Sequence, residues 1–162
     1  MIEYKQGNLL EEETEALVNT VNCVGVMGKG LALQFKGAFP ENFQNYKQAC
    51  EAQKVQPGKM FITSTDKTFP RYIINFPTKR HWRGKSRIED IEAGLKALVV
   101  EVERLNIKSI AIPPLGCGHG GLSWTVVKPL IIAAFAELPD VKVVIFEMGR
   151  TSAAGQVNKE MN

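Results

Sequence analysis

The chain has 162 residues, of which 44% are hydrophobic and 23% charged, and this size and composition are those of one globular domain. Its formal net charge of +3 is too small to identify a nucleic-acid-binding protein, so any such contact would need a local basic patch. Three widely spaced cysteines predict no disulfide framework, and two histidines offer no zinc-binding spacing, so we expect no metal site.

The first residues of the chain and its apolar runs argue against a secreted or membrane-spanning protein. Residues 1–10 lack the apolar segment of a signal peptide. No apolar run approaches the ~20 residues that span a bilayer. We therefore expect a cytoplasmic protein without membrane contact. The small, polar segment 150–162 predicts a flexible tail or truncated linker after a domain of residues 1–149.

Strand and helix patterns alternate along the chain. In chain order they predict strands at 2–6 and 16–21, helices at 28–39 and 41–53, strands at 60–64 and 72–76, a helix at 87–105, a strand at 108–113, a helix at 124–137 and a strand at 141–146. Ser86 is expected to cap the third helix, because Glu89 follows it at capping-box spacing. Strands rich in Ile and Val that alternate with helices predict a mainly parallel sheet covered on both faces.

Two glycine-rich segments follow predicted strands, at residues 22–30 and 115–121. Glycine lets the backbone approach a ligand closely and direct N–H groups at phosphate oxygens. Because both segments fall at the carboxyl edge of the sheet, they could hold a diphosphate from two sides. The alternative is that each is only a tight connection. Neither has the pattern of a Walker A loop or of a dinucleotide-binding fingerprint.

Single residues near this edge suggest further contacts. Lys79 closes a predicted strand, and a lysine beside a sugar anomeric carbon can act as a nucleophile or hold a ring-opened sugar as a Schiff base. The alternative is a solvated surface lysine. Asn8 follows the first strand and could bind an adenine amino group, although asparagine is also a common turn residue.

A basic segment extends from Lys79 to Arg87 and contains five Lys or Arg residues and one tryptophan. Cations can pair with phosphates and an indole can stack on an unpaired base, so the segment could contact DNA. The alternative is a solvated basic loop. The candidate DNA contacts are Arg80, Trp82, Arg83 and Lys85. The sequence shows no Ser-His-Asp triad and no paired carboxylates, so glycosidic chemistry here would need a lysine in place of the usual carboxylate.

Together these motifs resemble the macrodomain family over about residues 1 to 147. The resemblance rests on Gly7–Leu9, Asn19–Asn22, Gly28–Ala32 and Leu115–Gly121. With Asn75–Lys79 and Gly116–Trp124 added, the chain is similar to the DNA ADP-ribosyl glycohydrolase antitoxins of the DarG family. The resemblance implies an α/β protein with three α/β/α layers and a mostly parallel, mixed sheet.

The resemblance also implies a function. It predicts a glycosidase-type hydrolase that removes ADP-ribose from thymidine in single-stranded DNA, as the antitoxin of a DNA ADP-ribosyltransferase toxin. The expected partners are ADP-ribosylated single-stranded DNA, ADP-ribose and a cognate toxin, with ADP-ribose as ligand, no cofactor and a monomeric protein. The family antitoxins carry a further toxin-binding domain beyond the region that this chain matches. A non-catalytic ADP-ribose-binding module, a hydrolase of protein-linked ADP-ribose and a phosphatase of ADP-ribose 1″-phosphate remain alternatives.

By the same resemblance, Lys79 matches the catalytic lysine and Asn22 lies near the distal ribose. The ADP-ribose-binding residues that it implies are Asn8, Leu9, Thr20, Val21, Asn22, Gly28, Gly30, Leu31, Thr78, Gly116, Cys117, Gly118, His119, Gly120 and Gly121. The chain departs from a human relative that pairs its lysine with an aspartate, because Gly120 stands at the aspartate's position. A lysine–aspartate pair is therefore not expected.

Overall fold

The computed structural model describes residues 1–148, so the tail predicted at 150–162 lies outside the described residues. The elements are β1 Ile2–Lys5, the short 3-10 helix η1 Leu9–Glu11, β2 Ala16–Val21, α1 Gly30–Ala38, α2 Pro40–Glu51, β3 Phe61–Ser64, β4 Tyr72–Pro77, α3 Ile88–Arg104, β5 Ser109–Ile112, α4 Trp124–Phe135 and β6 Lys142–Phe146. None of the helices in residues 1–148 is long and apolar enough to cross a membrane.

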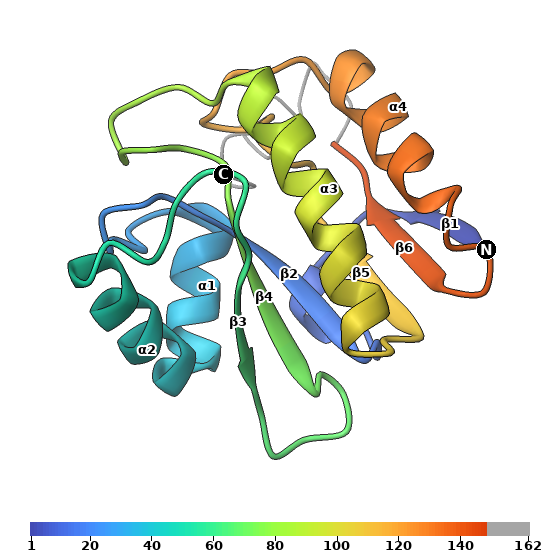
Figure 1. Ribbon diagram of the computed structural model, residues 1–162, viewed down its shortest axis with the longest axis horizontal. Helices are drawn as coiled ribbons and strands as arrows, with labels where there is room; N and C mark the ends of the chain where they lie inside the picture. Colours follow the sequence, from blue (N-terminus) through green and yellow to red (C-terminus); the bar gives the residue numbers. More distant parts are fainter. Residues whose placement is uncertain (149–162) are drawn as a thin grey trace.

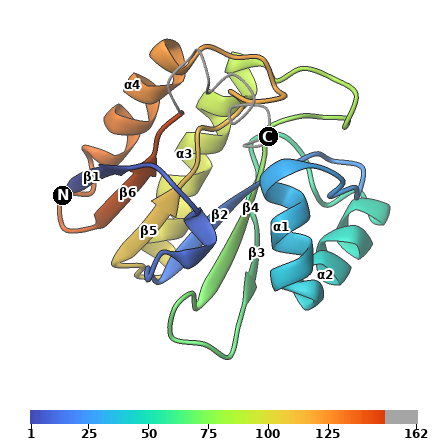
Figure 2. The ribbon, with the colours of Figure 1, turned by 180° about the vertical axis from the view of Figure 1, so that it is seen from behind.

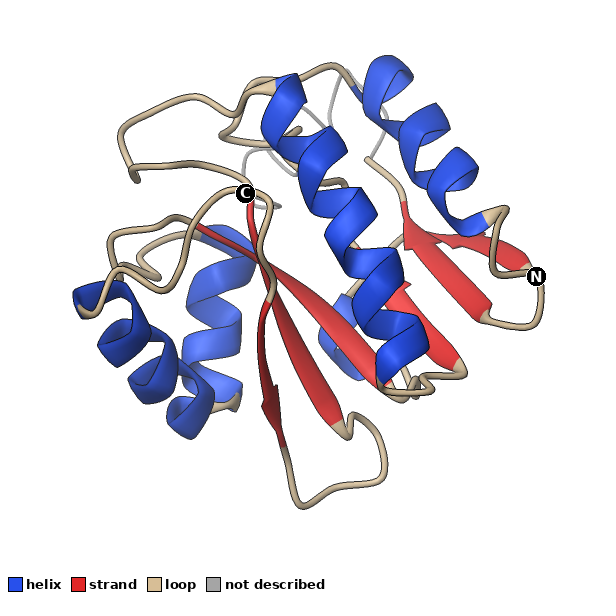
Figure 3. Cartoon of the chain, viewed as in Figure 1, coloured by secondary structure: helices blue, strands red, loops and turns tan. Residues whose placement is uncertain are grey.

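One six-stranded sheet forms the middle layer, in the order β1-β6-β5-β2-β4-β3. Every neighbouring pair is parallel except β3 and β4, which are antiparallel. Helices α3 and α4 cover one face, and α1 and α2 cover the other (Figures 1 and 2). Figure 3, with helices in blue and strands in red, shows the three layers directly. The predicted three-layer α/β/α fold with a mostly parallel, mixed sheet is confirmed.

Alternate residues of β2 explain why both faces of the sheet are covered. Val18 is fully buried in a core cluster with Leu95 of α3, whereas Leu17 is fully buried in a second cluster with Phe35 of α1. Successive side chains of a strand point to opposite faces, so an all-apolar strand must be covered on both sides. The register between β2 and β4 places Val21 beside Pro77, so the two strands end together.

Helix α3 packs so closely on β4 that Gly94 has no room for a side chain. A Cβ atom added at Gly94 would lie 2.3 Å from Cζ of Phe76, which is fully buried. We expect Gly94→Ala to lower the free energy of unfolding by about 1–3 kcal/mol, as overpacking of a core does. Denaturant unfolding measures this change.

Gly37→Ala is the matched control, because a Cβ at this helical position of α1 has no atom within 4 Å. This substitution should raise the free energy of unfolding by about 0.5–1 kcal/mol, since alanine loses less backbone entropy than glycine. Equal effects of the two substitutions would show that the contact with Phe76 is not what requires glycine at position 94.

The start of α3 corrects one prediction. Arg87, not Ser86, is the N-cap residue, and no side chain caps this helix. The Ser86 backbone N–H donates to the Gly120 carbonyl at 3.0 Å, and its buried side chain lies against the second glycine-rich loop. The capping-box prediction is wrong because this tertiary contact holds Ser86 away from the helix terminus. Similarly, α1 begins at Gly30 instead of residue 28, because Lys29 is still extended.

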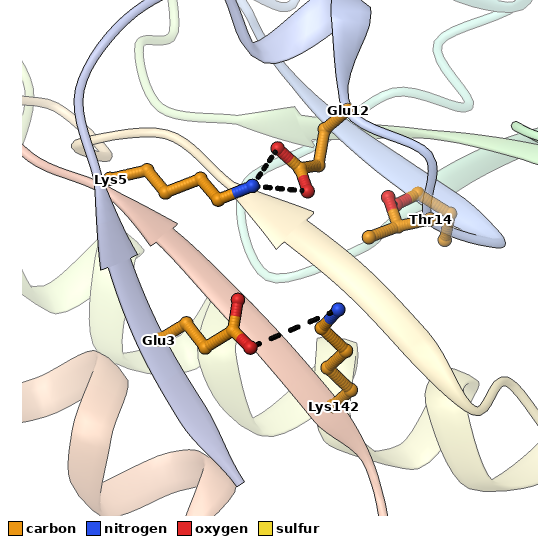
Figure 4. A network of polar contacts seen from close by, with 6 residues as sticks. Glu3, Lys5, Glu12, Thr14 and Lys142 are labelled. Atoms are coloured by element: carbon orange, nitrogen blue, oxygen red, sulfur yellow. Dashed lines mark hydrogen bonds and ion pairs between the residues drawn. The ribbon is translucent and has the colours of Figure 1, made fainter.

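Charged side chains pair on the surface around the edge strand β1 (Figure 4). Lys5 Nζ donates to both carboxylate oxygens of Glu12, at 3.0 and 2.9 Å, and Lys142 Nζ lies 3.9 Å from Glu3 Oε1. Exposed pairs of this kind each stabilise a protein by about 1 kcal/mol or less. These contacts connect β1 to β6 and to the segment that follows η1.

Candidate functional site

A cavity of about 510 Å³ opens beyond the carboxyl ends of β2 and β4. It is lined by Thr20, Val21, Asn22, Val26, Gly28, Lys29, Ala32, Lys79, Trp82, Arg83, Gly84, Lys85 and His119. These residues come from the end of β2, the first glycine-rich loop, the first turn of α1, the loop between β4 and α3, and the second glycine-rich loop. Among residues 1–148, the lining contains four Lys or Arg side chains and no carboxylate. Such a cavity suits an anionic ligand.

Asn22 fixes the shape of the first glycine-rich loop. Its Nδ2 donates to the Val26 carbonyl at 2.8 Å, and its Oδ1 accepts from the Val24 N–H at 3.1 Å and from the Tyr46 hydroxyl at 2.8 Å. Tyr46 is fully buried, and burial raises its pKa, which keeps the hydroxyl protonated as a donor. Because a side-chain amide has two N–H groups, one remains that could reach a ligand.

The ends of β2 and β4 hold the backbone of Lys79. The N–H groups of Thr78 and Lys79 both donate to the Val21 carbonyl, at 2.9 and 3.4 Å. The Cys23 thiol donates to the Lys79 carbonyl at 3.6 Å, and burial raises the pKa of this thiol to about 11, so the thiol keeps its proton. The position of Lys79 is therefore set by two strands that the sequence separates by about 50 residues.

The side chain of Lys79 is half-buried and lines the cavity. Its Nζ donates to the Trp82 carbonyl at 3.4 Å, and no ion pair among residues 1–148 involves it. Burial lowers the pKa of Lys79, and the charges of Lys29 and Lys85 lower it further. A lysine in this state supplies more neutral, nucleophilic amine near neutral pH than an exposed lysine does.

The second glycine-rich loop closes tightly on Ser86. A Cβ atom at Gly120 would lie 2.2 Å from Ser86 Oγ and 2.4 Å from the Gly116 carbonyl oxygen. Gly116 itself has a φ of +74°, which favours glycine. A side chain at position 120 would force this loop to move, which gives a physical reason for glycine here. From the same loop, His119 reaches the cavity.

The basic loop between β4 and α3 is partly occupied by contacts within the protein. Arg80 donates to both carboxylate oxygens of Asp90, from Nε at 3.1 Å and from Nη2 at 3.2 Å. The Arg83 guanidinium lies 4.5 Å from the centre of the Trp82 ring, and the His81 ring lies 5.4 Å from it. These neighbours are contacts that a base stacking on Trp82 would meet. Trp82 is nevertheless 43% exposed at the cavity.

The comparisons with known proteins agree with this geometry. The family model described as Macro domain matches residues 18–131. The chain belongs to the macrodomain family. It is 54% identical, over 147 residues, to the DNA ADP-ribosyl glycohydrolase of Mycobacterium tuberculosis, and the match covers 90% of this chain and 42% of that protein. This macrodomain thus spans about two fifths of the length of that relative.

Solved structures also resemble this macrodomain. The macrodomain of Mycobacterium tuberculosis DarG superposes with a TM-score of 0.91 at 53% identity, covering 92% of this chain and 99% of that one. Thermosipho africanus DarTG in complex with ADP-ribose superposes with a TM-score of 0.85 at 31% identity, covering 99% of this chain and 44% of that one.

The structure brings many of the predicted site residues of this macrodomain together. Those at the cavity are Thr20, Val21, Asn22, Gly28, Lys79, Trp82, Arg83, Lys85 and His119. The remaining predicted residues do not line it and are Asn8, Leu9, Gly30, Leu31, Thr78, Arg80, Gly116, Cys117, Gly118, Gly120 and Gly121. Their roles in ligand binding remain predictions.

Three of these residues have clear positions outside the cavity. Asn8 caps η1, since its Oδ1 accepts from the Leu10 N–H at 3.1 Å. Leu9 and Leu31 are buried together in one core cluster. Asn8 follows β1, which β6 and β5 separate from β2, so it lies toward the far end of the carboxyl edge from Lys79. A ligand with its adenine at Asn8 and its distal ribose at Lys79 would have to extend along the carboxyl edge of the sheet, as ADP-ribose can.

Four cavity residues were missed by the sequence analysis, namely Val26, Lys29, Ala32 and Gly84. Lys29 could have been found from the sequence, because it lies between two glycines of a loop that is expected at the carboxyl edge of the sheet, where the ligand binds. In this loop a ligand-binding role was expected for the backbone and for Asn22, and not for the side chain of Lys29. Residues 1–148 contain no group of three or more His, Cys, Asp or Glu side chains that could hold a metal ion.

Proposed function

We propose that this macrodomain binds ADP-ribose linked to thymidine in single-stranded DNA and hydrolyses the bond between the distal ribose and the base. The observation that carries this proposal is the half-buried Lys79, which lies in a cavity between two glycine-rich loops without a carboxylate partner. The identity of 54% to a DNA ADP-ribosyl glycohydrolase supports the same substrate, as does the likeness to a DarTG structure that holds ADP-ribose.

The chemistry follows from the residues of the cavity. Backbone N–H groups of the two loops hold the diphosphate, and the neutral amine of Lys79 attacks the anomeric carbon of the distal ribose. A bond forms between Nζ and this carbon while the bond to the base breaks, and the base leaves with the electron pair and takes up the proton that the amine loses. Water then hydrolyses the lysine–sugar bond and releases ADP-ribose.

Ordinary glycoside hydrolysis fits this cavity poorly. It uses two carboxyl groups, one as an acid and the other as a base or nucleophile. No Asp or Glu of the described residues lines the cavity, and Asp90, near the basic loop, is paired with Arg80. The lysine therefore takes the role that a carboxylate has in most glycosidases, and the tight packing at Gly120 leaves no room for a partner aspartate.

Single-stranded DNA and a DNA ADP-ribosyltransferase toxin are the proposed partners, and the cytoplasm is the proposed location. Single-stranded DNA would lie over the cavity mouth, where Trp82, Arg83 and Lys85 are exposed. The resemblance to the antitoxins favours a DNA ADP-ribosyltransferase toxin as the source of the substrate, and the action of a monomer in the cytoplasm and in DNA repair. The alternatives are a module that binds ADP-ribose without turnover and a hydrolase of another ADP-ribose linkage.

A comparison of three substrates tests the proposal. They are an oligonucleotide with one ADP-ribosylated thymidine, a peptide with glutamate-linked ADP-ribose and ADP-ribose 1″-phosphate. We expect kcat/KM on the oligonucleotide to exceed the others by at least about 100-fold, since a site built for one linkage leaves its polar groups unpaired with another. Faster turnover of the peptide or the phosphate would contradict the proposal. Tight binding of ADP-ribose in calorimetry without turnover of any substrate would support the binding module instead.

A further inference from the structure

Three lysines from two separate loops meet at one cavity. Lys79 follows β4, Lys85 lies later in the same loop, and Lys29 precedes α1. All three line the cavity, and no carboxylate from the described part of the chain lines it with them. Like charges gathered without a counter-charge are unfavourable for each other, so this arrangement costs stability that a purely structural loop would avoid.

We propose that Lys29 and Lys85 are positioning residues whose fixed positive charges favour the neutral amine of Lys79. The inference rests on the proposed function only for the use of that amine as a nucleophile. Its physical basis is repulsion, because a third ammonium in the same half-buried cavity interacts unfavourably with the other two. Lys79 is half-buried and Lys85 and Lys29 are exposed, so Lys79 is the lysine whose charge is least solvated.

Other charged groups around Lys79 do not cancel this effect. Arg83 also lines the cavity and adds positive charge, while Arg80 is paired with Asp90 of α3. Cys23 bonds to the Lys79 carbonyl and keeps its proton, because burial raises its pKa to about 11. His119, from the loop between β5 and α4, also borders the cavity.

The start of α1 adds to the same effect. Lys29 is the N-cap residue of this nine-residue helix, and Gly28, Lys29 and Ala32 border the cavity. A helix N-terminus carries partial positive charge, which disfavours a nearby ammonium. Consistent with this arrangement, the pKa of Lys79 is lowered by burial first and then by Lys29 and Lys85.

The test is a pH titration of Lys79 in the full chain without substrate. Lysine is labelled with ¹³C, the Cε shifts are followed by NMR, and the Lys79 signal is assigned by its loss in Lys79→Arg. We expect Lys85→Gln to raise the pKa of Lys79, Lys85→Glu to raise it further, and Lys29→Gln to raise it as well. Lys85→Arg keeps the charge and should leave the pKa of Lys79 unchanged. Lys96→Gln, at an exposed position of α3, is the control for loss of a distant charge.

A second readout is the pH dependence of kcat/KM, which reports the free enzyme. Its rise should move to higher pH in Lys85→Gln and not in Lys85→Arg. An unchanged or lowered pKa of Lys79 in both Lys85→Gln and Lys85→Glu would overturn the inference. Because the NMR titration needs no turnover, it remains decisive even if Lys79→Ala proves fully active, which would contradict the proposed function alone.

Discussion

Lys79→Ala is expected to lower kcat/KM for release of ADP-ribose from an ADP-ribosylated thymidine oligonucleotide by roughly 100- to 10,000-fold, the range seen when one positioned reacting group is lost. The physical reason is that, among the described residues of the cavity lining, no other lysine or arginine is as poorly solvated as Lys79. Thr20 and Asn22 are neutral, and the other cations are more exposed than Lys79. The measurement is single-turnover release of ADP-ribose at several pH values.

Two controls separate catalysis from binding. ADP-ribose affinity, measured by calorimetry, should change far less in Lys79→Ala than kcat/KM does, because the loops that hold the diphosphate keep their own hydrogen bonds. Lys79→Arg keeps a cation but cannot supply a neutral amine, so it should be as inactive as Lys79→Ala. Full activity of Lys79→Arg would show that a fixed positive charge is sufficient, and undiminished release by Lys79→Ala would remove this residue from the mechanism.

The pH dependence of the native protein has a definite sign. Burial and two neighbouring lysines lower the pKa of Lys79, so the neutral amine becomes populated at lower pH than in an exposed lysine. The value of kcat/KM should therefore rise with pH and level off below the pH at which an ordinary lysine would titrate. A flat profile would argue against proton loss by Lys79 before the chemical step.

The sequence predicted the fold well because its strand segments contain clear apolar runs. Residues 16–21 and 108–113 contain apolar runs of the kind that are buried on both faces, and these occur mainly in parallel sheets between helices. In a parallel sheet the carboxyl ends of the strands share one edge. Lys79 and the first glycine-rich loop each follow a strand, so both are expected at that edge. The pairing of Val21 with Pro77 in β2 and β4 realises this expectation.

The sequence predicted less where a residue depends on distant contacts. Ser86 has the spacing of a helix cap, yet its contact with Gly120, 34 positions later, decides its role. The sequence shows no sign that Tyr46 and the first glycine-rich loop use most of the Asn22 amide, and the contact of Asn22 with the ribose remains a prediction. The lowered pKa of Lys79 arises from burial and from the approach of Lys29, and neither is a local property of the sequence.

Gly120→Asp is the second substitution with a large expected effect. It introduces a carboxylate at a point where a Cβ would lie 2.2 Å from Ser86 Oγ and 2.4 Å from the Gly116 carbonyl. One of these atoms belongs to the backbone, so the loop itself must move. We expect a loss of about 1–3 kcal/mol in the free energy of unfolding. A displaced loop can no longer direct its N–H groups at the diphosphate in the same way. We expect ADP-ribose affinity to fall by at least about tenfold, which corresponds to a loss of about 1.4 kcal/mol in binding free energy.

Gly28→Ala is the control for replacing a glycine at the same cavity. A Cβ there meets only Val26, at an ordinary contact distance of 3.5 Å, so the free energy of unfolding should stay within about 1 kcal/mol of the native value. Thermal unfolding and calorimetry with ADP-ribose compare the two variants. If Gly120→Asp bound ADP-ribose as tightly as the native chain, the second loop would have to move away from Ser86 without loss of its binding geometry. Close packing would then not be the reason for glycine at position 120.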